Sequence, residues 1–60
     1  MNMHEIHDYA RRFLGTYGAK AEAEAAQRAA DFEKAGDKLQ AEEWRRIQAA
    51  ISSMRGPHAS

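Results

Sequence analysis

The residues with the clearest capacity for chemistry lie in the stretch HEIHD, residues 4–8. Residues three apart share one face of a helix, so His4 and His7 can approach one metal ion together. Two imidazoles do not make a site, and a third ligand would have to come from Asp8, His58 or a second subunit. The zinc-protease pattern HExxH needs its histidines four apart, so the spacing here does not match it. We interpret HEIHD as the solvated flank of a helix, and a metal or small-ligand site using His4, His7 and Asp8 is the alternative.

The hydroxyl groups of the chain do not form a catalytic pattern. Ser52, Ser53 and Ser60 come late in the sequence without the spacing of a triad, and Thr16 lies in a predicted turn. An enzyme also needs a pocket with converging polar groups, which sixty residues in three short helices scarcely enclose. We therefore expect neither catalysis nor a cofactor.

The charge pattern argues against nucleic acid as the partner. Nine basic and nine acidic residues cancel, and the two signs are interleaved along the chain. Paired arginines occur at Arg11-Arg12 and Arg45-Arg46. The helix predicted to hold the second pair opens with Asp37, Glu42 and Glu43, which would repel phosphate. A nucleic-acid-associated protein remains a second alternative.

Length and composition indicate one small all-α domain. A core of this size usually needs a staple, and the absence of cysteine excludes disulfides and thiolate zinc sites. Oligomerisation or a protein partner is the remaining route to stability. No apolar run approaches the ~18 residues of a membrane span, and the first residues lack the pattern of a signal peptide. We expect a soluble cytoplasmic protein without membrane contact.

Apolar spacing at steps of three and four predicts three helices, from Met3 to Leu14, from Ala19 to Ala35 and from Lys38 to Arg55. Asn2 suits the N-cap of the first helix, with Glu5 completing a capping box. Opposite charges four apart predict ion pairs within the helices. These pairs are Lys20–Glu24, Glu24–Arg28 and Glu42–Arg46.

Two glycine-containing stretches separate the helices. Gly36 suits the left-handed position that ends a helix, and Asp37 suits the N-cap of the next, so the pair predicts an antiparallel helical hairpin. The stretch from Gly15 to Gly18 predicts a turn, because each glycine costs a helix interior about 1 kcal/mol relative to alanine. A kinked continuous helix is the alternative there.

A longer pattern begins with an aromatic residue or histidine before glycine and continues with alanines four apart, Gly-Asp and Trp-x-x-Ile-x-x-Ala-Ile. Its positions in this chain are Tyr17-Gly18, Ala21, Ala25, Ala29, Gly36-Asp37, Trp44, Ile47, Ala50 and Ile51. In these positions the chain resembles a group of short, uncharacterised bacterial proteins. The resemblance implies a compact helical-hairpin protein and carries over no function.

We predict a single helical domain over residues 1–55 and a flexible tail over residues 56–60. The domain is a three-helix unit that forms a dimeric helical bundle. Large apolar residues exceed what so small a monomer covers, so we expect partial exposure of several of them. We expect this exposure for some of the residues Ile6, Phe13, Trp44 and Ile51.

The function predicted from these features is a protein–protein interaction or self-association module. Its partner is a second copy of the chain or an unidentified protein. Tryptophan and other large apolar residues anchor many interfaces. The expected contact residues are Phe13, Trp44, Ile47 and Ile51.

Overall fold

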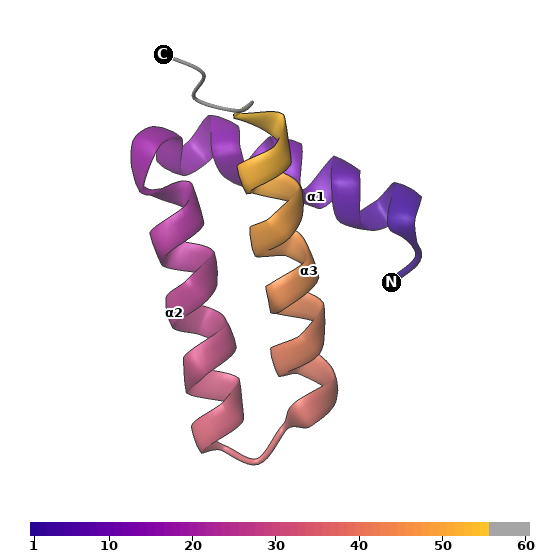
Figure 1. Cartoon of the computed structure of the whole chain (residues 1–60), viewed down its shortest axis with the longest axis vertical. Coiled ribbons are helices and arrows are strands. Elements are labelled where there is room, and N and C mark those ends of the chain that lie inside the picture. Colours follow the sequence, from indigo (N-terminus) through magenta and orange to yellow (C-terminus); the bar gives the residue numbers. More distant parts are fainter. Residues whose placement is uncertain (56–60) are drawn as a thin grey trace.

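The structure is a computed structural model that describes residues 1–55, and its regular elements are all helical. Helix α1 spans Met3–Tyr17, a short 3₁₀ turn η1 spans Gly18–Lys20, and helices α2 and α3 span Ala21–Lys34 and Lys38–Met54. Helices α2 and α3 form an antiparallel hairpin, and α1 lies crosswise over the end of the hairpin farthest from its turn (Figure 1). The all-α prediction is confirmed, while the predicted tail over 56–60 lies outside the described residues.

The start of α1 is fixed by the predicted capping box. The Asn2 side chain accepts a hydrogen bond from the Glu5 amide at 2.8 Å, and the Glu5 carboxylate accepts one from the Asn2 amide at 3.2 Å. Two amide groups that a helix leaves without an internal partner are thereby satisfied. The sequence was sufficient here because both partners lie within one turn.

The end of α1 differs from the prediction. Gly15 lies inside the helix, which continues to Tyr17 instead of ending at Leu14. The chain reverses at Gly18, whose φ of 58° favours glycine and whose amide donates to the Leu14 carbonyl. The extra turn of helix keeps Tyr17 on the face of α1 that carries Phe13, and packing against the hairpin outweighs the low helix propensity of Gly15.

The turn between α2 and α3 is the one predicted. Gly36 has a φ of 81°, and its amide donates to the Glu33 carbonyl, while the Asp37 amide donates to the Phe32 carbonyl. This pair of hydrogen bonds is the Schellman arrangement that closes a helix. The Asp37 side chain then accepts from the Gln40 amide at 3.1 Å and caps α3.

The core lies where the three helices meet. Helix α2 contributes three fully buried alanines, and their small side chains let the larger residues of α3 approach its backbone. Ile6, Ile47 and Ile51 are the largest side chains that are completely buried. The buried residues of the core are Ile6, Ala10, Phe13, Ala21, Ala25, Ala29, Trp44, Ile47, Ala50 and Ile51.

Two ion pairs connect α2 to α3 and to the residue that follows α3. Arg45 of α3 lies 3.3 Å from Glu33 of α2, and Arg55 lies 3.5 Å from Glu22. The ion pairs predicted four residues apart in α2 and α3 do not form within residues 1–55. Solvent competes for exposed pairs at any spacing, so each contributes little to stability. No helix over this range is both long enough and apolar enough to cross a membrane.

Candidate functional site

The predicted contact residues lie inside the folded chain. Phe13 and Trp44 are 6% and 8% exposed, and Ile47 and Ile51 are completely buried. The expectation that Ile6, Phe13, Trp44 and Ile51 remain partly exposed is therefore wrong. Helix α1 lies across the hairpin, so one chain by itself covers these side chains. An interface of this folded unit has to use other side chains.

A cluster of aromatic rings joins α1 to the middle of α3. Tyr9, Phe13 and Tyr17 follow one another at four-residue steps along α1, and neighbouring rings lie 6.1 Å and 4.5 Å apart. The Trp44 ring meets Tyr9 at 5.5 Å and Phe13 at 5.4 Å, both edge to face. Such contacts add about 0.5–1.5 kcal/mol each beyond the area that they bury.

Arg28 of α2 extends over this aromatic cluster. Its guanidinium carbon lies 5.3 Å from the ring centres of Phe13 and Trp44 and 5.9 Å from that of Tyr17. One terminal nitrogen donates to the Tyr17 hydroxyl at 3.1 Å, while the buried Nε atom has no hydrogen-bond partner. The ring faces attract the cation, so Arg28 ties all three helices together.

The position of Arg28 in the sequence indicates contact with the neighbouring helices, but the prediction paired it with Glu24 of its own helix. Arg28 comes seven residues after Ala21 and three after Ala25, which places it beside the buried alanines of α2. A cation beside the buried alanines can reach the neighbouring helices as well as Glu24, and in the structure Arg28 contacts the aromatic rings of those helices. This cluster is an internal staple that connects all three helices of a chain without cysteine.

The histidines of HEIHD diverge in the structure. His4 is 88% exposed and its Nε2 atom lies 3.7 Å from the carboxylate of Asp8, whereas His7 lines a groove beside α3. Over residues 1–55 no three histidine or carboxylate side chains lie close enough together to hold a metal ion. His58, the other candidate ligand, lies outside the described residues. Within the described part, HEIHD supplies two separate imidazoles.

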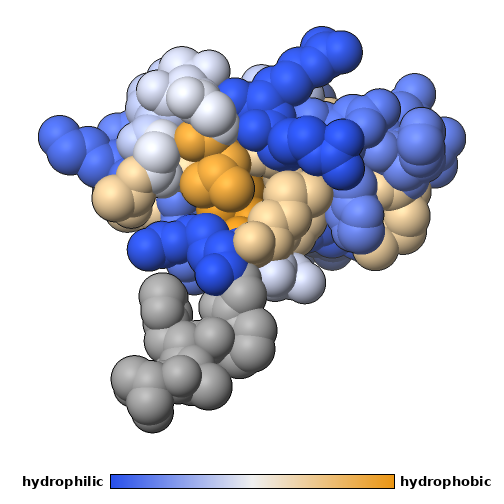
Figure 2. All heavy atoms as spheres, turned by 90° about the horizontal axis from the view of Figure 1, so that it is seen from above, coloured by the Kyte–Doolittle hydropathy of each residue, from blue (hydrophilic) through white to orange (hydrophobic). Residues whose placement is uncertain are grey.

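Exposed apolar side chains gather near the start of the chain. Met1, Met3 and Tyr9 are 50%, 64% and 39% exposed, and the fourth large exposed apolar residue, Leu39, lies at the opposite end of the hairpin. The first turns of α1 project sideways beyond α3 (Figure 1), and we call residues 1–12, which contain these turns, the α1 arm. Seen from above, hydrophilic side chains surround a smaller apolar area on the face formed by α1 and the end of α3 (Figure 2).

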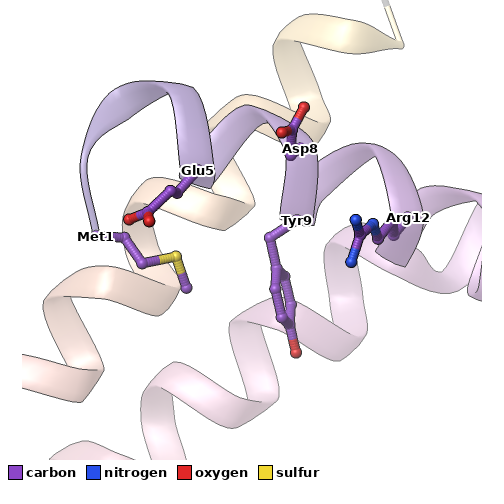
Figure 3. A pocket seen from close by; sticks show the side chains of 5 residues that line it. All are labelled: Met1, Glu5, Asp8, Tyr9 and Arg12. Carbon is purple, nitrogen blue, oxygen red and sulfur yellow. The ribbon is translucent and has the colours of Figure 1, made fainter.

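One shallow hollow, the arm hollow, lies along the α1 arm. It has a volume of about 340 Å³ and is lined by Met1, Glu5, Asp8, Tyr9 and Arg12. Figure 3 shows Glu5 and Arg12 toward opposite ends of the hollow, with Tyr9 extending from α1 between them. An acidic group, an aromatic ring and a basic group therefore follow one another along one face of the helix.

A second depression, the α1–α3 groove, lies on another flank of the arm. It has a volume of about 400 Å³, and its lining is mostly apolar, with basic side chains from both helices. The two depressions place the arm between two surfaces that a second chain can contact. The lining residues of the groove are Met3, His7, Arg46, Ala49, Ala50 and Ser53.

Gly36 and Asp37, the predicted turn and cap, lie far from the arm at the closed end of the hairpin (Figure 1). Their contacts are those of a helix end and a helix start, so their role is structural. Comparisons with protein-family models, with curated proteins and with solved structures find no match for this chain.

Proposed function

We propose that this protein is a protein–protein interaction module that associates through the α1 arm, with a second copy of the chain as its first partner and the cytoplasm as its expected location. The observation that carries the proposal is the position of the exposed apolar side chains: Met1, Met3 and Tyr9 all lie on the arm. Exposed apolar side chains flanked by polar groups are typical of interaction surfaces.

The crosswise packing of α1 supports this role. A helix that lay along the hairpin would cover one whole stripe, whereas α1 crosses the hairpin and leaves its first turns projecting. The two depressions described above flank those turns, so a second polypeptide can reach the arm without opening the core. Because the aromatic cluster joins the three helices within one chain, the folded unit can present the arm to a partner.

The experiment that tests the proposal is sedimentation equilibrium over a wide concentration range. Met3→Glu alters the α1–α3 groove, and Arg12→Glu alters the arm hollow. We expect the wild-type chain to self-associate and at least one of these variants to weaken that association. Leu39→Glu is the matched control, because Leu39 is about as exposed as Met3 but lies at the other end of the hairpin.

Two results would count against the proposal. Equal weakening by Leu39→Glu and by both arm variants would remove the arm as the contact surface. A wild-type chain that stays monomeric throughout, and whose arm amides show no concentration-dependent NMR shifts, would exclude self-association. Circular dichroism of each variant separates loss of association from loss of folding, since all three substituted side chains are exposed.

A further inference from the structure

We infer that two copies of this chain pair through the arm hollow, with the two α1 helices antiparallel about a two-fold axis that passes between Asp8 and Tyr9. This inference rests on the proposed function and names both the partner and the contact. The two ends of the hollow carry it: Glu5 and Arg12 each face the other in a copy that runs in the opposite direction, while Asp8, beside the axis, faces its own copy.

The spacing of the charges fits a two-fold axis. Glu5 and Arg12 are seven residues apart, which is about 10.5 Å along a helix and close to two full turns, so both lie on one face. When a second α1 runs in the opposite direction, Glu5 of each copy faces Arg12 of the other. In a two-fold interface each contact occurs twice, so one acidic and one basic residue produce two opposite-charge pairs.

Neither charged group is committed to an ion pair within residues 1–55. Arg12 makes no ion pair over this range, and Glu5 uses one carboxylate oxygen to accept from the Asn2 amide. The second oxygen of Glu5 is available to an arginine of another chain. The side chain of Tyr9, 39% exposed, supplies apolar surface beside the axis.

The α1–α3 groove does not fit a second copy in the same way. Its basic side chains come from His7 and Arg46, and no acidic residue lines it. Two copies that met through this groove about a two-fold axis would bring like charges together, which disfavours association. The arm hollow offers two opposite-charge pairs beside the one like-charge contact of Asp8 with its copy, whereas the groove offers only like charges, so the balance of charge favours the hollow for self-association.

The expected dimer is weak. One face of a fifteen-residue helix is small beside the ~1,600 Å² that standard stable interfaces bury, so we expect a dissociation constant in the micromolar range or above. Its pairs are exposed at the rim, where they set specificity and orientation more than affinity. Concentration-dependent measurements are the appropriate readout.

The test exchanges the charges and measures association by sedimentation equilibrium. Glu5→Lys places an ammonium group opposite Arg12 of the copy, and Arg12→Glu places two acidic groups together, so each variant alone should associate about tenfold more weakly than the wild type. An equimolar mixture of the two variants should regain association, because both contacts in the mixed dimer again join an acidic group to a basic group. The double variant Glu5→Lys/Arg12→Glu should also associate with itself, because both of its pairs again join opposite charges.

The double variant controls for folding. Glu5→Lys removes half of the capping box, and the double variant carries that same loss, so only restored charge pairing can make it associate better than Glu5→Lys alone. Helicity by circular dichroism should be the same for the two. Failure of both the mixture and the double variant to regain association would overturn the inference.

Cross-linking determines the direction of the helices, because the chain contains no native cysteine. In the antiparallel arrangement Asp8→Cys lies beside its own copy and should form a disulfide dimer under mild oxidation. Arg12→Cys should not, because its copies are separated by about two helical turns, beyond the ~7 Å that a disulfide spans between Cα atoms. Leu39→Cys gives the background rate.

The remaining outcomes separate the inference from the proposed function. Disulfide dimers of both Asp8→Cys and Arg12→Cys above background would indicate parallel helices and overturn the inference. Association that weakens with Met3→Glu but not with Arg12→Glu would overturn it as well, while leaving the arm as the contact surface. A wild-type chain that remains monomeric at every concentration would overturn both.

Discussion

The guanidinium carbon of Arg28 lies 5.3 Å from the ring centre of Trp44, and the two residues belong to neighbouring helices of the hairpin. The same guanidinium reaches Phe13 and Tyr17 of α1, so one side chain contacts all three helices. A chain of sixty residues has a small core, and a contact that joins every helix contributes to its stability out of proportion to its area. Arg28 thus takes the place that a disulfide occupies in other small domains.

We predict that Arg28→Ala lowers the free energy of unfolding by about 1–3 kcal/mol, because it removes the cation–π contacts and the packing of the arginine stem. Arg28→Lys should recover only part of this loss, because an ammonium group lacks the planar surface that stacks on rings. Urea denaturation followed by Trp44 fluorescence measures both. A fully stable Arg28→Ala variant would show that the aromatic rings suffice alone.

Alanine substitutions at three glycines should change the stability of the protein in opposite directions. Gly15 lies inside α1 with open space where a Cβ would stand, so Gly15→Ala should stabilise the protein by about 0.5–1 kcal/mol. Gly18 and Gly36 have positive φ values, so alanine at either position should destabilise it by about 1 kcal/mol or more. Thermal melts of the three variants compare them directly, and a destabilising Gly15→Ala would argue that the chain turns at Gly15.

The features that the sequence predicted correctly are local ones. The caps at Asn2 and Asp37 and the left-handed Gly36 depend on residues within one turn of each other, so their spacing was enough to find them. The apolar stripes also followed from periodicity. The antiparallel hairpin could be predicted from its two helices and the short connection between them.

The features that the sequence missed depend on how the helices cross. Periodicity gives the buried face of α1 but not its direction across the hairpin, and this direction decides that Phe13 and Trp44 are covered while the first turn projects. Arg28 was assigned to Glu24 because pairs within a helix are visible in sequence, whereas aromatic partners on two other helices are not. The arm hollow was missed for the same reason.

Because Trp44 is buried, a substitution at this position tests the stability of the fold rather than its association. Removing this ring should cost about 3–5 kcal/mol, which is comparable with the whole stability of a small domain. We therefore expect Trp44→Ala to unfold the monomer, with loss of helical circular dichroism at every concentration. A Trp44→Ala variant that keeps its helicity but loses association would instead place Trp44 at an interface.

The histidines of HEIHD give a prediction about metal. His4 pairs with Asp8 on the outer side of α1, while His7 lines the α1–α3 groove. Binding of metal to the native fold would raise its melting temperature. We expect the wild type and a His4→Ala/His7→Ala variant to melt at temperatures that do not change when zinc is added or a chelator is present. A zinc-dependent rise in the wild type that the variant lacks would establish a site that includes these imidazoles.

The charge pairing inferred for the dimer predicts its dependence on salt. Glu5 and Arg12 lie at the surface, where screening weakens attraction as the Debye length falls from ~10 Å at 0.1 M salt to ~3 Å at 1 M. We expect the dissociation constant of the wild-type dimer to rise severalfold over this range. The chain as a whole is neutral, so net repulsion between copies contributes little, and the trend reports the local pairs. Sedimentation equilibrium at several salt concentrations measures this, with the double variant Glu5→Lys/Arg12→Glu expected to follow the same trend. Association that strengthens with salt would indicate that apolar contact, as in the α1–α3 groove, holds the copies together instead.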